Sequence, residues 1–232
     1  MSTLTASDID VDYPESDGKR MADNTVQWDW MVTIVGELRD RYAGQEVFVA
    51  GDLLWYPVKG EPRVVAAPDA MVAFGRPAGD RTSYLQWLEA GIAPQVVFEV
   101  LSPSNTESEL DDKLEFYERH GVEEYYVIDP YENAVEGYVR RSRRLAQVRK
   151  IHGHISPRLG IRFEKSGDEL RIVGSEGRAF QTRQERVEDL LGEVGEERQR
   201  IVVEKRRADE EKRQKDKLAA KLRELGIDPD GV

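Results

Sequence analysis

Residues 96–101, Val96-Val97-Phe98-Glu99-Val100-Leu101, place one carboxylate inside an otherwise apolar run. A short apolar run of this kind predicts a β-strand that is buried on both faces. Side chains alternate along a strand, so Val97, Glu99 and Leu101 share one face. An isolated buried carboxylate is costly, so we expect Glu99 to be paired, protonated or bound to a cation.

Helical and strand-like patterns flank this run on both sides. Thr106 and Glu109 form a capping box that predicts a helix ending at His120, just before Gly121. A first helix is expected from Asn24 to near Gly44, with one face made of Gln27, Met31, Ile34, Leu38 and Tyr42. Further strands are expected at 46–50, 53–56, 63–67, 70–74, 124–128, 134–139, 145–151 and 159–163, and a short helix at 82–90. This order predicts an α/β fold, with a mixed sheet flanked by helices.

Charge divides the 232 residues into parts of different composition. Residues 1–12 read as a flexible acidic tail and 13–180 as a globular domain. Residues 181–232 are expected to form a charged helical tail, because 181–225 contains 25 charged residues and no aromatic residue. Gly192 and Gly195 predict that the helix is continuous only after 195.

The tail has one apolar position in every seven residues, from Val187 through Val194 and Ile201 to Leu222, interrupted by Lys215. The second heptad position that would face a partner helix contains Glu197, Glu204 and Glu211, and this series is apolar only at its ends. A coiled coil needs both seams to be apolar. The tail could therefore be a single charged helix, a weak coiled coil that mediates self-association, or a docking helix.

Composition excludes several classes of protein. With no cysteine, the chain has no disulfide, thiol nucleophile or Cys-ligated metal. No apolar run reaches the roughly 18–20 residues that span a bilayer, and the first residues do not resemble a secretory signal, so we expect a cytoplasmic protein with no membrane contact. The net charge of −11 argues against a non-specific polyanion binder but is compatible with a nuclease that uses carboxylates.

A second acid lies in a comparable apolar setting. Asp69 follows Pro68, which lacks an N–H group and suits a bulge or a sheet edge. On the helix predicted after Glu99, Lys113 lies about 60° from the centre of the apolar stripe and flanks the side facing the sheet. Asp69, Glu99 and Lys113 could therefore converge on one site.

Two acids and a lysine are suited to metal-assisted hydrolysis of a phosphodiester. Asp69 and Glu99 would bind Mg²⁺ or Mn²⁺, with a backbone carbonyl near Val100 as a third ligand. The ion lowers the pKa of a water molecule and balances negative charge in the transition state. Lys113 would orient the attacking water or neutralise the phosphate.

A set of motifs spread along the chain supports this reading. The set comprises Gly51-Asp52-Leu53-Leu54-Trp55-Tyr56, Pro68-Asp69, Phe74-Gly75-Arg76-Pro77, Glu99-Val100-Leu101-Ser102-Pro103-Ser104, Asp112-Lys113 with Tyr117, Gly121-Val122, Glu124-Tyr125-Tyr126 and Asp129-Pro130. Together they resemble the Uma-two family of bacterial proteins, which is placed in the PD-(D/E)XK nuclease superfamily.

The resemblance covers roughly residues 13–180. It implies a restriction-endonuclease-like core, with Asp69 and Glu99 as metal ligands, DNA as substrate and a homodimer as a common assembly. Where the superfamily pattern has a lysine two residues after the glutamate, this chain has Leu101. Lys113 is our candidate for a lysine that has moved to the adjacent helix.

Other interpretations of these residues remain open. Asp69 could be a turn residue, and Glu99 could form a structural ion pair with Lys113. Asp52 could extend the metal site or belong to a turn, and Glu37 could reach the site but is more typical of a solvated acid. A basic cluster could contact DNA or be a solvated hairpin; it contains Arg140, Arg141, Arg143 and Arg144. The alternative function is an inactive nuclease-fold module for binding or assembly, with the tail setting the oligomeric state.

Overall fold

A computed structural model describes residues 11–16, 18, 20–167 and 169–224. Most of the predicted acidic tail, residues 1–10, lies outside the described residues. The chain divides into two compact units between Thr182 and Arg183.

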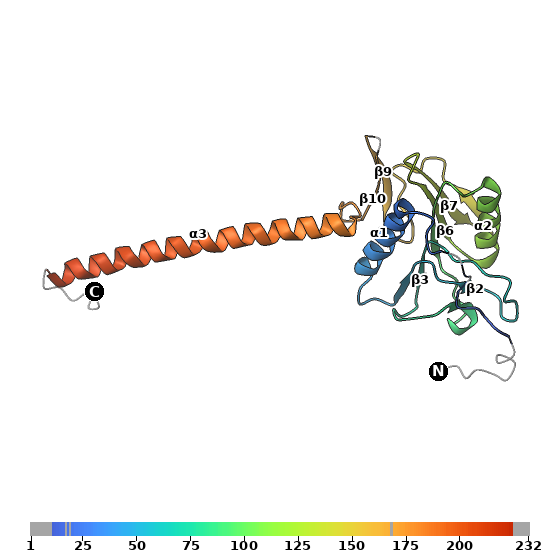
Figure 1. The fold of residues 1–232 in the computed structure, drawn as a ribbon, viewed down its shortest axis with the longest axis horizontal. Helices are drawn as coiled ribbons and strands as arrows, with labels where there is room; N and C mark the ends of the chain where they lie inside the picture. Colours follow the sequence, from blue (N-terminus) through green and yellow to red (C-terminus); the bar gives the residue numbers. More distant parts are fainter. Residues whose placement is uncertain (1–10, 17, 19, 168, 225–232) are drawn as a thin grey trace. The chain divides into compact units, whose positions relative to one another are not determined.

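A six-stranded mixed sheet forms the centre of the first unit (Figure 1). β5 and β6 are parallel and are connected through a helix, whereas the other neighbouring strands are antiparallel. The strands, in their spatial order, are β1 (Val47–Ala50), β3 (Ala70–Phe74), β5 (Val96–Val100), β6 (Glu124–Asp129), β7 (Ala134–Arg141) and β8 (Arg144–Gln147).

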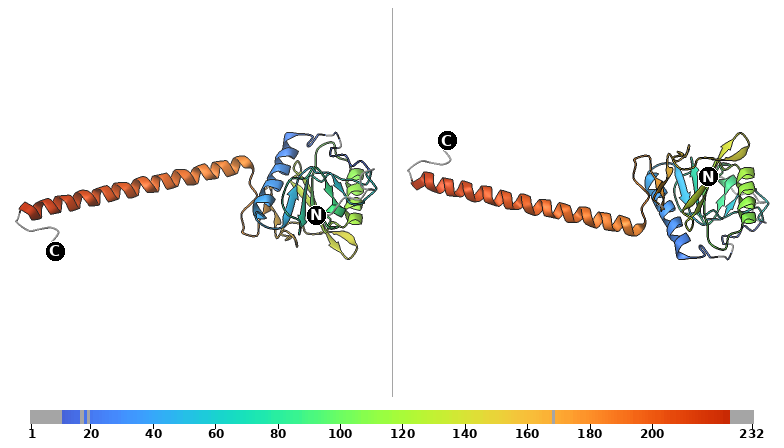
Figure 2. Two further views of the ribbon diagram at one scale, coloured as in Figure 1. Left: turned by 90° about the horizontal axis from the view of Figure 1, so that it is seen from below. Right: turned by 90° about the horizontal axis from the view of Figure 1, so that it is seen from above.

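Helices α1 (Thr25–Arg41) and α2 (Glu107–His120) cover opposite faces of this sheet (Figure 2). Met31, Ile34 and Leu38 of α1 pack in one apolar core, on the face that includes Phe98. The second core lies under α2 and includes Val97 and Tyr117. The predicted α/β class, with a mixed sheet between helices, is therefore confirmed, and β5 alternates between the two cores as expected.

Local signals account for the limits of both helices. The Asn24 side chain accepts a hydrogen bond from the Gln27 N–H at the start of α1. The capping box of Thr106 and Glu109 is present at the start of α2. Gly121 ends α2 at φ 97°, a left-handed conformation that glycine adopts without steric cost.

Several predicted elements differ from the structure outside the central sheet. Residues 63–67 form no strand, only one bridge from Ala66 to Trp55, and the prolines at 62 and 68 limit pairing at either end. The helix expected at 82–90 is wrong: β4 (Tyr84–Leu85) pairs with β2 (Trp55–Tyr56), and only a 3₁₀ turn, η2 (Gln86–Leu88), follows. Here, burial of Tyr84 overrides local helix propensity.

A separate hairpin follows the main sheet. It pairs β9 (Arg162–Ser166) with β10 (Glu169–Val173). The strand predicted at 159–163 begins three residues before β9. β10 was not predicted, because Glu169 and Arg171 interrupt its apolar residues in a short segment.

The second unit contains α3 (Arg183–Glu224), a 42-residue helix with no buried residue among its described side chains. Its early start contradicts the expectation of a continuous helix only after 195. Gly192 and Gly195 each cost about 1 kcal/mol in a helix interior, but the surrounding residues are strong helix formers. Among the helices that the structure describes, none has an apolar stretch long enough to cross a membrane.

Candidate active site

Glu99 is buried on the face of β5 that α2 covers, with only 2% of its surface exposed. Lys113 Nζ lies 2.7 Å from Glu99 Oε2, and the Tyr117 hydroxyl donates a hydrogen bond to Glu99 Oε1. Lys113 and Tyr117 are four residues apart, so they project from the same face of α2. One helix thus supplies a donor to each oxygen of this carboxylate.

The pKa values of these partners follow from their burial and charge. Burial alone would lower the pKa of Lys113, but the carboxylates of Glu99, Asp69 and Glu109 together outweigh it and raise the pKa, so this lysine is a cation. Burial and the neighbouring Glu99 carboxylate raise the pKa of the Tyr117 hydroxyl well above its ordinary value. Tyr117 therefore acts as a hydrogen-bond donor at neutral pH.

Asp69 lies immediately before β3 and points toward β5. The Val100 N–H donates to Asp69 Oδ2 over 2.7 Å. Burial raises the pKa of Asp69 to about 8, and repulsion from Glu99 adds to this effect. The Val100 N–H group, Lys113 and Gln27 act in the opposite direction and do not offset the increase.

Gln27, which sequence reasoning did not assign to the site, connects α1 to it. Its Nε2 donates to the Val100 carbonyl over 2.9 Å, and its Oε1 accepts from the Asp23 N–H over 2.8 Å. A polar residue on the apolar face of the predicted first helix was a usable signal, because buried polar groups need partners. Tyr117 was similarly counted only as part of an apolar stripe.

Gln27, Asp69 and Lys113 line an open cleft of about 660 Å³, whereas Glu99 and Tyr117 are buried and are not among its lining residues. Asp23 also lines this cleft, and its carboxylate accepts hydrogen bonds from the Ser102 and Ser104 hydroxyls. Those bonds lower the pKa of Asp23 and tie the segment before α1 to the loop after β5. The cleft is lined by both acids and bases, among them Arg20, Asp52, Asp69, Glu109, Asp112 and Lys113.

The donor set fits a small, hard divalent cation. Two carboxylates facing one lysine leave a net charge of −1 when both acids are ionised, and a cation would relieve the repulsion that raises the pKa of Asp69. No group of three or more His, Cys, Asp or Glu residues that could hold a metal occurs among the described residues. Mg²⁺ commonly takes only one or two protein carboxylates and keeps several waters, so two carboxylates with a backbone carbonyl are compatible with such an ion.

Comparison with known proteins gives the family. Residues 25–172 match the model of the Uma2 family, described as "Putative restriction endonuclease". The chain belongs to the Uma2 family. A solved structure described as a putative nuclease belonging to DUF820 from Anabaena variabilis ATCC 29413 is 16% identical, with a TM-score of 0.43, and the match covers 58% of this chain and 72% of that one. No curated protein matched.

The predicted family resemblance is thus confirmed, and the Uma2 match includes α1, α2 and the whole central sheet. It also includes Asp69, Glu99 and Lys113, which the structure brings together. Asp52 lines the same cleft; its N–H donates to the Pro68 carbonyl over 3.0 Å and its φ is 48°. Asp52 is therefore a turn residue that also lines the cleft.

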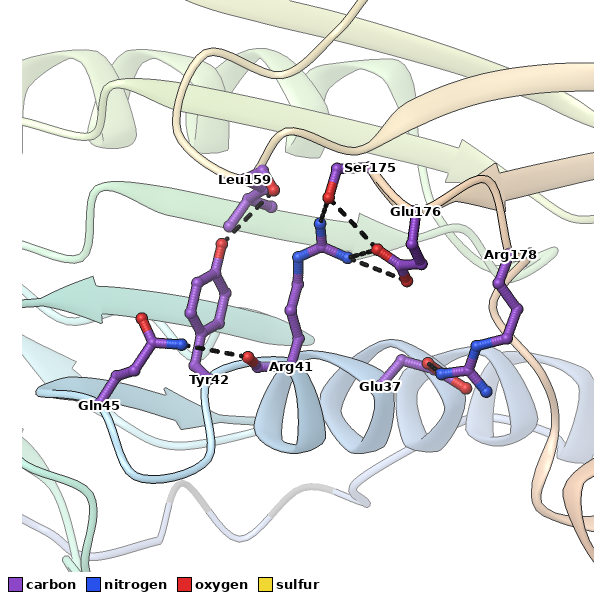
Figure 3. A network of polar contacts seen from close by, with 8 residues as sticks. All are labelled: Glu37, Arg41, Tyr42, Gln45, Leu159, Ser175, Glu176 and Arg178. Atoms are coloured by element: carbon purple, nitrogen blue, oxygen red, sulfur yellow. Dashed lines mark hydrogen bonds and ion pairs between the residues drawn. The ribbon is translucent and has the colours of Figure 1, made fainter.

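Glu37 lies at a different place from the one considered in the sequence (Figure 3). It is 5% exposed, so the interpretation as a solvated acid is wrong. Arg178 Nη2 lies 3.3 Å from its Oε2, and the Gln181 N–H donates to its Oε1, because the segment after β10 covers this part of α1. Glu37 is not among the residues that line the cleft.

The basic cluster of the Uma2 domain is also outside the described lining of the cleft. Arg140 donates to the Val122 and Glu118 carbonyls, both over 2.7 Å, and so serves carbonyls at the end of α2. Arg141, Arg143 and Arg144 are exposed around the β7–β8 turn. Contact between these three arginines and DNA stays a prediction, whereas the Arg140 side chain already forms hydrogen bonds within the domain.

Proposed function

We propose that this Uma2 protein hydrolyses phosphodiester bonds of DNA with the help of Mg²⁺ or Mn²⁺. The observation that carries the proposal is the arrangement around Val100. Its N–H binds Asp69, the preceding Glu99 binds Lys113, and its carbonyl accepts a hydrogen bond from Gln27. Family membership supports a nuclease-like activity.

Asp69, Glu99 and the Val100 carbonyl would hold the ion. A divalent cation supplies a Lewis acid that lowers the pKa of water and offsets negative charge on the phosphate. The Val100 carbonyl has a second lone pair beside the one that accepts from Gln27. The Lys113 ammonium has three N–H donors, and one donates to Glu99. The other two can bind a phosphate oxygen or orient a water molecule.

The test measures cleavage of linear and plasmid DNA with Mg²⁺ or Mn²⁺. We expect Asp69→Asn, Glu99→Gln and Lys113→Met each to lower the rate by about 10²–10⁴-fold, because each removes a charge that acts on the reacting groups. Calorimetry with Mn²⁺ should show heat for the wild type and its loss in Glu99→Gln.

Asp112→Asn is the matched control. Asp112 lines the same cleft, but the structure shows no hydrogen bond or ion pair between Asp112 and Asp69, Glu99 or Lys113. Its rate should stay within a few fold of the wild type. A wild type that is as inert as Glu99→Gln on every substrate, with no Mn²⁺ heat, would overturn the proposal.

A second candidate function rests on α3. We propose that this helix joins the protein to a second copy, because it carries exposed apolar side chains in its first turns, namely Val187, Leu190, Leu191 and Val194. Isolated helices gain little stability without packing an apolar face, so a partner helix would stabilise α3. In this reading the nuclease-like domain is a binding or assembly module.

A further inference from the structure

An apolar hollow adjoins the carboxylates on the α1 side. It has a volume of about 280 Å³ and its wall includes Met21, Trp28, Val32 and Val35. Asp52 and Asp69 line both this hollow and the larger cleft, so the two adjoin at these residues. A group bound at Asp69 therefore has an apolar surface beside it.

The apolar surface is unusually open to solvent. Trp28 is 43% exposed, Val32 36% and Met21 52%. Trp28 and Val32 are four residues apart and so lie on one face of α1. Trp28 directly follows Gln27, which reaches the Val100 carbonyl, so the same turn of α1 presents both an indole and a contact to the candidate site.

The charges around the cleft argue against recognition through many phosphates. Five carboxylates and two basic groups line it among the described residues. Duplex DNA is usually held by Lys and Arg contacts to both backbones, which an acidic lining disfavours. Binding to an unpaired strand also uses phosphate contacts, but it adds stacking of bases against aromatic side chains, worth about 1–3 kcal/mol per base. Arg39 is the one cation in the described wall of the hollow, and its Nε is held by the Val49 carbonyl at 3.1 Å.

We propose that the hollow beside Trp28 holds an unpaired nucleobase next to the phosphate that the cation at Asp69 and Glu99 would bind, so that the substrate class is single-stranded DNA or a locally unpaired strand. This inference rests on the proposed nuclease function and adds its substrate class. The size of the hollow suits one planar ring, because sites for larger ligands occupy roughly 300–1,000 Å³. Trp28 supplies the stacking surface, and Arg39 supplies donors at the rim.

The test uses the full-length protein and a fluorescently labelled 12-nucleotide oligothymidylate, with Ca²⁺ as the cation. Anisotropy should show tighter binding of the single strand than of a duplex of equal length. Trp28→Ala should weaken single-strand binding about 5- to 150-fold, the effect of losing one stacked base. Trp28→Phe should keep most of the affinity because it keeps an aromatic face.

Tyr131→Ala is the matched control. Tyr131 is an aromatic residue with 45% exposure at the β6–β7 connection, and it lines neither the cleft nor the hollow. It should bind like the wild type. Equal affinity of Trp28→Ala and the wild type, a preference for duplex, or no binding at all would overturn the inference. A fall in solution mass caused by Trp28→Ala, without a change in DNA binding, would assign this face to a second copy instead.

The two proposals fail in different ways. Single-strand binding that depends on Trp28, without any metal-dependent cleavage, would leave the stacking site intact and remove the nuclease function. If cleavage depends on Glu99 but Trp28→Ala cleaves single-stranded and duplex substrates as fast as the wild type, the nuclease function stands and the stacking site is removed. Circular dichroism of each variant checks that the exposed Trp28 is not needed for folding.

Discussion

Glu99 shows how much one residue can reveal before a structure is known. Its burial followed from strand alternation in an apolar run, and the structure confirms it at 2% exposure. Lys113 could be placed from helical geometry because it lies a fixed rotation from the apolar stripe. Tyr117 could not be separated from the core, since a buried tyrosine packs its ring in the same way whether or not its hydroxyl has a partner.

Tyr117→Phe tests whether that hydroxyl positions Glu99. The variant keeps the ring and leaves Glu99 Oε1 without its donor from α2. Partners of metal-ligating side chains usually contribute 10- to 100-fold to metal affinity or activity, so we expect a loss of Mn²⁺ affinity in about that range, measured by calorimetry.

A packing role alone would give a different pattern. Tyr138→Phe is the matched control, because the Tyr138 hydroxyl donates to Glu136, which is outside the candidate site. It should leave Mn²⁺ affinity unchanged. If Tyr117→Phe lowers the free energy of unfolding but binds Mn²⁺ as the wild type does, Tyr117 supports the fold and does not position Glu99.

At the scale of elements, prediction succeeded where the signals were local. The limits of α2 follow from its capping box and Gly121, and β5 and β6 are identified by their apolar runs. It failed where tertiary contacts decide. Residues 82–90 carry a helical pattern, but the Tyr84 hydroxyl donates to the Ile92 carbonyl and its ring is buried, which holds the segment as β4 and a 3₁₀ turn.

Glu89, at the end of this segment, belongs to an ion cluster with Arg76 and Arg81 that should make stability depend on pH. Glu89 Oε2 lies 2.8 Å from Arg76 Nε, and Glu89 Oε1 lies 2.7 Å from Arg81 Nε. Burial alone would raise the pKa of Glu89, but hydrogen bonds from Arg81 and Arg76 outweigh it, and the pKa is lowered. The folded state therefore binds this proton less readily than the unfolded state, so the stabilisation is complete above the unfolded pKa of 4.5 and is lost as pH falls through the folded value.

Glu89→Gln should accordingly lower the free energy of unfolding at pH 7 by about 1.5–3 kcal/mol, the usual contribution of hydrogen bonds to a charged group. The difference from the wild type should shrink as pH falls below 4.5. Urea unfolding at several pH values measures both effects. Glu115→Gln, which removes an exposed ion pair with Arg119, should change stability by less than about 1 kcal/mol. A Glu89→Gln effect that is constant from pH 7 to pH 3 would contradict this account.

At the scale of the whole molecule, the chain joins a domain with two apolar cores to a helix that buries nothing by itself. Charge arithmetic predicted this contrast, but it could not decide whether the helix has a partner. The layers of its heptad repeat bear on that question. In a parallel pair, Glu197, Glu204 and Glu211 would each face their own copies, and like charges in such layers are destabilising.

An antiparallel pair centred on residue 206 removes these repulsions. Leu190 then lies opposite Leu222 and Val194 opposite Leu218, and Glu197 faces Lys215. If α3 joins two copies, we therefore expect the helices to be antiparallel. The native chain has no cysteine, so single cysteines can report which residues are close.

A short thiol-reactive cross-linker should join Leu190→Cys chains to Leu222→Cys chains when the two are mixed, and should join neither variant to itself. Each variant has a single cysteine, so any link joins two chains; in the antiparallel pair the two copies of one position lie about 48 Å apart, too far for a short cross-linker. Gln199→Cys mixed with Leu222→Cys is the control, because position 199 lies on the outer face of this repeat and should not react. Cross-linking of Leu190→Cys to itself would instead indicate a parallel pair, and a monomeric mass by sedimentation with no cross-linked product would show that α3 is a single helix.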